Sequence, residues 1–271
     1  MSVSADARRI TAIARRDLQT ERTYPIRYII RFLQAGVSLV IAFYVSKLVL
    51  EPPELADFRG GYFDFVIIGL TVMAIAGLGI GTFNQNITTE QSLGTFEILL
   101  STPTRVPVLL AGSFVFPLLL TVLDMALLLG LGVGLLGDGL PISGLAFAIP
   151  LLLLTLATFC AFGIVGASLL VLVKRGDPLT GPLLQLTSIL SGALFPVSVL
   201  PQPVETLARA FPAYYGITGV REALLGDGGW GDVWPDMAVL AGFAAVLLPL
   251  SVRLFSRALA AARRAGTLAN Y

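Results

Sequence analysis

Long apolar runs alternate with short polar connections along most of the chain. Transmembrane β-barrels show alternating segments of about ten residues, and this sequence lacks that pattern. Helices are the other way to satisfy backbone polar groups in lipid, and each needs about 20 residues to span the bilayer. The pattern therefore predicts an all-α integral membrane protein with six transmembrane helices, at Ile29–Leu50, Tyr62–Phe83, Val108–Leu136, Gly144–Val173, Leu179–Leu200 and Met237–Phe255.

The composition supports a membrane protein. Of the 271 residues, 56% are hydrophobic and 13% are charged, whereas a soluble domain has about 25% charged residues. The mean hydropathy is +0.85. The net charge of +1 gives no reason to expect a nucleic-acid partner. The chain has no histidine and one cysteine, Cys160, so we expect neither an internal disulfide nor a metal site.

The distribution of basic residues predicts the orientation in the membrane, because cytoplasmic loops carry an excess of Lys and Arg. If both termini share one side, that side holds 14 of the 18 basic residues. They are Arg8, Arg9, Arg15, Arg16, Arg22, Arg27, Arg31, Arg105, Lys174, Arg175, Arg253, Arg257, Arg263 and Arg264. The other side holds Lys47, Arg59, Arg209 and Arg221. We therefore expect both termini to be cytoplasmic, in the inner membrane of the cell.

Residues 1–28 have the pattern of a helix that lies in the membrane interface. Small or apolar residues recur at helical spacing at Ala7, Ile10, Ala14 and Leu18, with Ile13 beside them. The arginines lie elsewhere on the helical wheel, where they can meet anionic lipid headgroups. The alternative is a tail that only sets topology. Residues 29–257 then form the membrane region and 258–271 a cytoplasmic tail, within one domain of residues 1–271.

The polar interruption Asn84–Arg105 has the pattern of a short amphipathic helix on the cytoplasmic side. Thr88 and Gln91 have the spacing of a capping box at a helix start, and Pro103 would end the helix. Its apolar arc consists of Leu93, Phe96, Leu99 and Leu100, and its polar arc of Glu90, Gly94, Glu97 and Ser101. The segment either contacts a partner in the cytoplasm or only joins two spans.

Prolines interrupt the chain after Leu200, at Pro201, Pro203 and Pro212, so no single span fits. We expect two short helices that enter the outer leaflet and return, covered by protein or water. Trp230 and Trp234 suit membrane-interface anchors, and Tyr214 and Tyr215 suit either anchors or a functional role.

Asp124 is a carboxylate inside the third apolar run. At mid-membrane it costs about 2.5–3.5 kcal/mol on insertion scales, so it should face protein or water. It either lines a transport pathway or subunit interface, or makes a structural hydrogen bond to a neighbouring span. Asp64, near the outer end of the second span, is expected to be interfacial.

Glycines cluster inside three spans, which favours close approach of helix backbones in lipid; a glycine-lined path for substrate is the alternative. The clustered residues are Gly77, Gly79, Gly81, Gly130, Gly132, Gly134, Gly163 and Gly166.

Two blocks resemble the ABC-2 family of membrane permeases. Glu90-Gln91 followed by Gly94–Pro103 is similar to the cytoplasmic segment of that family. Ser191–Pro196, Leu200-Pro201, Pro212 and Arg221–Gly226 are similar in order and spacing to its C-terminal signature. The blocks lie on predicted opposite sides of the membrane, and with the six spans they cover essentially the whole chain.

The resemblance implies a coupling helix that docks on an ATP-binding cassette subunit. It assigns this role to Glu90, Gln91, Gly94, Phe96, Glu97, Leu99 and Leu100. It also implies an outer gate in the re-entrant region, assigned to Phe195, Pro196, Pro212, Tyr214, Tyr215, Arg221 and Glu222. The second permease copy in such an exporter would be identical or a paralogue.

The chain has no phosphate-binding loop, because neither of its lysines, Lys47 and Lys174, ends a GxxxxGK[ST] run. We therefore expect ATP and Mg²⁺ on the partner subunit and no catalytic residue in this chain. The expected substrate is an amphipath moved outward: a lipid, a glycolipid or lipid-linked glycan, or a drug-like molecule.

Two other function classes fit less well. An ion-coupled secondary transporter requires spans broken at matching places and intramembrane charges, and only Asp124 lies mid-span. An intramembrane protease requires histidine or a pair of mid-membrane aspartates, which the sequence does not supply.

Overall fold

The computed structural model describes residues 3–22, 26–48, 61–95, 106–136, 142–173, 179–226 and 229–264. Throughout these ranges the chain forms helices and short turns. The elements are α1 (Val3–Arg22), α2 (Ile26–Leu48), α3 (Gly61–Ser92), α5 (Val106–Leu127), the π-helix η2 (Leu128–Leu136), α6 (Ile142–Val173), α7 (Thr180–Leu190), the 3₁₀-turn η3 (Val197–Val199), α8 (Gln202–Ala210), α9 (Pro212–Leu225) and α10 (Trp230–Arg264).

Within the described residues, four helical segments are long and apolar enough to cross a membrane: Gly61–Ser92, Pro107–Gly132, Gly144–Val173 and Trp230–Arg264. Phe32–Leu48 in α2 is a shorter apolar helix. The all-helical membrane class is thus confirmed. The boundary of the fifth predicted span is wrong, because α7 has 11 residues and is about 16 Å long, roughly half the thickness of the hydrocarbon core.

The chain leaves α7 at a turn that a continuous span cannot contain. Ser191 caps α7, and Gly192 follows with a φ of 72°. A left-handed φ is readily adopted by glycine and ends a helix. Pro196 then precedes the 3₁₀-turn, whose last residue is Val199. Within residues 191–200, Ala193 and Val197 are buried in the protein, whereas Leu194 and Val199 are 44% and 58% exposed.

Close packing of α3 on α6 forms the centre of the bundle. A Cβ on Gly163 would lie 2.1 Å from the carbonyl oxygen of Gly79, and a Cβ on Gly79 would lie 2.7 Å from the carbonyl carbon of Phe159. Only glycine permits this contact, which confirms the packing interpretation for both positions. Gly81 and Gly130, in contrast, have no atom of the described residues within 4 Å of a built Cβ, so the described part of the chain gives no packing reason for them.

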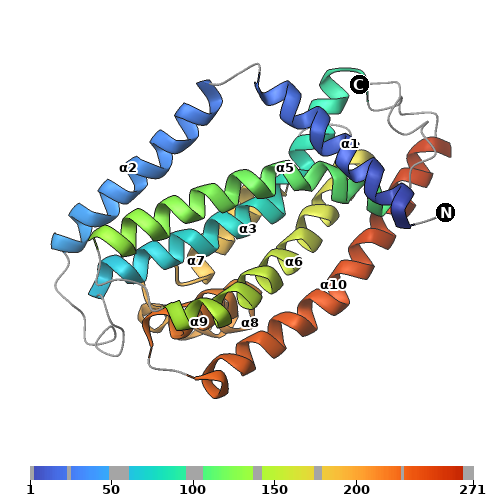
Figure 1. Ribbon diagram of the computed structural model, residues 1–271. Coiled ribbons are helices and arrows are strands. Elements are labelled where there is room, and N and C mark those ends of the chain that lie inside the picture. Colours follow the sequence, from blue (N-terminus) through green and yellow to red (C-terminus); the bar gives the residue numbers. More distant parts are fainter. Residues whose placement is uncertain are drawn as a thin grey trace.

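The proline-rich segment forms two short helices, as expected. Pro203 and Pro212 lie in the first turns of α8 and α9, where the missing N–H costs no helical hydrogen bond. α9 is deeply buried, with Ile217 and Leu224 at most 2% exposed. In Figure 1, α8 and α9 lie beside the start of α10, at the end of the bundle away from α1.

α1 confirms the predicted N-terminal helix and lies across one end of the bundle, where it packs against α5 (Figure 1). Ile13 contacts α5 at Gly112, where a Cβ would lie 2.7 Å from the Ile13 Cδ1 atom. Arg8 and Arg15 are exposed, which fits the predicted polar face. Leu18, predicted on the apolar face, is 39% exposed.

Candidate functional site

The end of α3 differs from the sequence-based expectation. Thr88 does not begin a helix, because α3 passes through it and ends at Ser92. The Gly94 N–H donates to the Gln91 carbonyl at 3.0 Å, and the Thr95 N–H to the Glu90 carbonyl at 3.0 Å. With Gly94 at a φ of 67°, these bonds form a Schellman motif, the usual helix C-terminus.

A capping box satisfies free N–H groups only where no helical turn precedes it. Here the carbonyls of the preceding turn of α3 already accept from the N–H groups that follow Thr88. Thr88 and Gln91 therefore have no free N–H groups to cap. Asn84, where the polar interruption begins, is likewise inside α3 and only 2% exposed. The first residues of the predicted separate helix are therefore the last turns of α3, which is one of the spans.

Glu90 connects this helix end to α1. Its Oε1 atom lies 3.0 Å from Nη2 of Arg16, and its Oε2 atom accepts a hydrogen bond from the Thr95 hydroxyl. The Glu90 side chain is 15% exposed and the Arg16 side chain 51%. Glu90 thus organises the junction of α1, α3 and the segment that follows. Phe96, Glu97, Leu99 and Leu100 lie outside the described residues.

Arg221 on α9 is the centre of a contact defined by Phe65, Gly69, Gly192, Ala193 and Arg221. We call it the outer clasp, after the side of the membrane that the basic residues predict for it. The Arg221 guanidinium is buried and donates to three backbone carbonyls. The donor–acceptor distances are 3.2 and 3.0 Å to Phe65, 2.9 Å to Gly192 and 2.8 Å to Ala193. Its Cζ atom also lies 3.3 Å from the Phe65 ring centroid.

Gly69 and Gly192 make room for the outer clasp. A Cβ on Gly69 would lie 2.2 Å from the Ala193 carbonyl oxygen, so the turn after α7 rests directly on the α3 backbone. The left-handed Gly192 reverses the chain there and turns two consecutive carbonyls toward Arg221. The outer clasp therefore joins α3, the turn after α7 and α9 into one unit.

The other predicted gate residues lie in the turn before η3 and on α9. Phe195 and Pro196 are half-buried in the turn before η3, and Pro212 is buried at the start of α9. The rings of Tyr214 and Tyr215 meet edge-to-face at 5.4 Å. Tyr214 packs against the cluster around Leu190, while Tyr215 packs against the main core.

Further residues of the outer region have distinct environments. Glu222 is half-buried, and its Oε1 atom would lie 2.6 Å from a Cβ on Gly226. Trp230 and Trp234, proposed as anchors, are 58% and 54% exposed. Asp64, expected to be interfacial, is 1% exposed in the first turn of α3.

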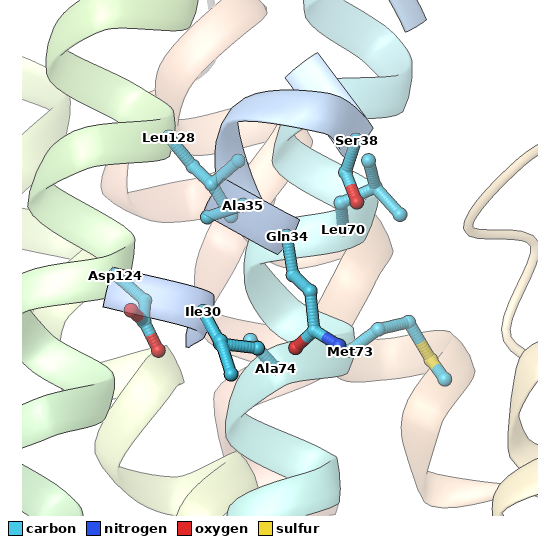
Figure 2. A pocket seen from close by; sticks show the side chains of 9 residues that line it. All are labelled: Ile30, Gln34, Ala35, Ser38, Leu70, Met73, Ala74, Asp124 and Leu128. Carbon is cyan, nitrogen blue, oxygen red and sulfur yellow. The ribbon is translucent and has the colours of Figure 1, made fainter. Parts of the chain in front are cut away.

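Asp124 is 9% exposed and lines a cavity of about 690 Å³. Figure 2 shows this cavity between α2, α3 and the end of α5, with the Asp124 carboxylate directed toward α2. Gln34 and Ser38 of α2 supply its other polar side chains. Six apolar side chains complete the lining, among them Ile30, Met73 and Leu128.

Sequence reasoning missed several of these residues. Gln34 and Ser38 lie one helical turn apart in an apolar run, and this spacing could have indicated a polar stripe on one face of α2. Asn84 donates from Nδ2 to the Thr180 hydroxyl at 2.6 Å and packs against Gly166 of α6. No local pattern links Asn84 to Thr180, because their contact depends on how α3, α6 and α7 meet.

Comparisons with known proteins agree with this architecture. Residues 27–253 match the family model described as ABC-2 family transporter protein. The chain is 27% identical over 232 residues to the daunorubicin resistance ABC transporter permease protein DrrB1 of Streptomyces coeruleorubidus, covering 81% of this chain and 77% of that protein. It is also 36% identical over 66 residues to the uncharacterized protein YhgE of Bacillus subtilis (strain 168), covering 24% of this chain and 8% of that protein.

The matched region extends from the start of α2 into α10 and includes both the end of α3 and the outer clasp. This chain is a multi-pass membrane protein that belongs to the ABC-2 family of transporter permeases.

Proposed function

We propose that this chain is the membrane-spanning subunit of an ATP-driven exporter that moves an amphipathic substrate outward. The observation that carries the proposal is the continuity of α3. This single helix of 32 residues, about 48 Å long, joins the segment that resembles a coupling helix to the outer clasp. A displacement applied at one end of the helix reaches the other without crossing a loop.

The proposed mechanism uses α3 as a rigid connection. Closure of two ATP-binding cassette subunits pushes the segment from Glu90 to Leu100. The ion pair between Arg16 and Glu90 carries α1 with that movement. At the far end, the Arg221 guanidinium of α9 is bonded to a carbonyl of α3 and to two carbonyls of the turn after α7. Both α9 and this turn therefore move with α3. The outer gate thereby responds to ATP.

The partner and the substrate class complete the proposal. ATP and Mg²⁺ are bound by a separate subunit, so this chain performs no catalysis itself. A second permease, identical or a paralogue, completes the pathway, and both termini face the cytoplasm. The relative DrrB1 is named for daunorubicin resistance, which supports a drug-like amphipath over a lipid-linked glycan. An ion-coupled secondary transporter is the alternative mechanism.

Affinity purification of the tagged chain from native membranes, followed by mass spectrometry, tests the proposal. We expect an ATP-binding cassette protein to co-purify. Phe96→Asp and Glu97→Lys should remove most of it, because they place charge, or the wrong charge, in the proposed docking segment. Ala260→Asp is the control, since Ala260 is exposed on α10 and outside that segment.

All three variants must elute as folded protein in size-exclusion chromatography. Full recovery of the ATPase with both segment variants would overturn the coupling assignment. Absence of any ATP-binding cassette protein from the native preparation, together with ion-gradient-driven transport in vesicles, would favour the secondary transporter.

A further inference from the structure

The cavity beside Asp124 is an open groove, in which Asp124 is 9% exposed while Gln34 and Ser38 of α2 are exposed. Its volume of about 690 Å³ lies within the roughly 300–1,000 Å³ of typical small-molecule sites. Its walls come from α2, α3 and the end of α5. All three elements belong to the apolar membrane region, so a hydrophobic molecule reaches the cavity from the bilayer.

The polar groups in the lining prefer hydrogen-bond donors. A carboxyl side chain has two oxygens, which together offer about four lone-pair sites that accept hydrogen bonds. Asp124 already has an interaction within the chain, and it still retains capacity to accept another bond. The Gln34 amide and the Ser38 hydroxyl can each donate or accept a hydrogen bond, so they can pair with either kind of polar group on a ligand. The Asp124 oxygens accept, so Asp124 favours a ligand that carries a donor.

An anionic head fits this cavity poorly. A phosphate or sulfate brings acceptors and negative charge, so it would place acceptor oxygens against the acceptor oxygens of Asp124. An amine or a hydroxyl brings donors. The remaining lining, including Met73 and Leu70 of α3, is apolar and suits a hydrocarbon or aromatic body.

We infer that this cavity binds an amphipath whose polar end is an amine or another hydrogen-bond donor, and that it discriminates against phosphate-bearing amphipaths. The inference rests on the proposed function, because it narrows the substrate class of the same permease. Gln34 and Ser38 orient the polar end, and Asp124 accepts its donor.

Photolabelling of the full chain in membrane vesicles tests the inference with two probes that differ only in the head. Both carry the same alkyl chain and benzophenone, and one ends in a primary amine and the other in a phosphate. Labelled peptides are identified by mass spectrometry. We expect the amine probe to label the α3 peptide that contains Met73 saturably, with an apparent affinity at least about tenfold above that of the phosphate probe.

Asp124→Asn should weaken the amine probe about tenfold, and Ser38→Ala should weaken it a few-fold. The matched controls are Asp232→Asn and Ser256→Ala, which alter exposed residues of α10 and should leave labelling unchanged. If Asp124→Asn does not elute as folded protein, Ser38→Ala and Gln34→Leu decide the question.

Equal affinity of the two probes at Met73, or unchanged amine labelling in the folded Asp124 and Ser38 variants, would overturn the inference. So would non-saturable labelling, which indicates partition from lipid only. Labelling requires no ATPase, so its failure is distinguishable from failure of the proposed function. If the chain co-purifies with its ATPase but shows no amine selectivity, only the proposed ligand site is refuted. If labelling is amine-selective but no ATPase partner is found, only the proposed exporter function is refuted.

Discussion

Replacement of Arg221 by methionine gives the most direct test of the outer clasp. The change keeps a long side chain but removes all the donors that hold Phe65, Gly192 and Ala193. The Gly192 and Ala193 carbonyls then lose a charged donor in a buried environment. A hydrogen bond to a charged group contributes about 1.5–3 kcal/mol net. All four bonds of Arg221 are lost, but the Phe65 carbonyl lies inside α3, so the estimate counts only the bonds to Gly192 and Ala193.

We therefore expect Arg221→Met to lower the free energy of unfolding by about 3–5 kcal/mol, allowing for partial relaxation of the turn. A loss of this size is a large fraction of the roughly 5–15 kcal/mol that holds a typical protein folded. Arg221→Lys should lie between wild type and Arg221→Met, because an ammonium retains the charge but cannot reach three carbonyls with a planar fork.

The assay is unfolding by sodium dodecyl sulfate in mixed micelles, followed by tryptophan fluorescence and circular dichroism. Arg209→Met is the matched control, because it makes the same substitution in the same outer region. Arg209 is 61% exposed and, among the described residues, pairs with Glu205 on its own helix, so we expect a change within about 1 kcal/mol. An Arg221→Met protein that unfolds within about 1 kcal/mol of wild type would refute the clasp as a stabilising contact.

Two further predictions concern helix contacts along α3. Gly69→Ala should destabilise the protein by about 1–3 kcal/mol, because its methyl group would lie 2.2 Å from the Ala193 carbonyl oxygen. Gly81→Ala on the same helix has open space and should be neutral or slightly stabilising; equal effects in the detergent-unfolding assay would contradict the close contact. A double-mutant cycle of Asn84→Ala and Thr180→Val should give a coupling energy of about 0.5–1.5 kcal/mol, and a coupling near zero would show that their 2.6 Å hydrogen bond does not stabilise the fold.

The hydrophobic pattern predicted the helical membrane class and the presence of the N-terminal helix, because lipid permits few ways to satisfy a backbone. It failed at boundaries where apolar residues serve protein contacts. Residues 191–200 are as apolar as a span, yet Gly192 turns the chain there. Thr88 and Gln91 have the spacing of a helix start, yet they lie in a helix that ends at Ser92.

The candidate sites show the same division. Asp124 was found in the sequence because a charge inside an apolar run is costly, and Arg221 because it lies in the block that resembles the ABC-2 C-terminal signature. Their partners were not found, since backbone carbonyls of Phe65, Gly192 and Ala193 carry no side-chain signal. Gln34 and Ser38 became relevant only when α2 was placed opposite Asp124.

The sequence by itself determined that this is a helical membrane protein with a polar segment between two spans and an unusual outer segment, because period and polarity are local properties of a chain. The tertiary structure decided that α3 joins these two segments as one helix, that Arg221 fastens the outer segment to it, and that Asp124 faces a cavity. These features are contacts between residues distant in sequence. They depend on how closely the helices approach one another, as at Gly69 and Gly79, and on buried donors such as Arg221.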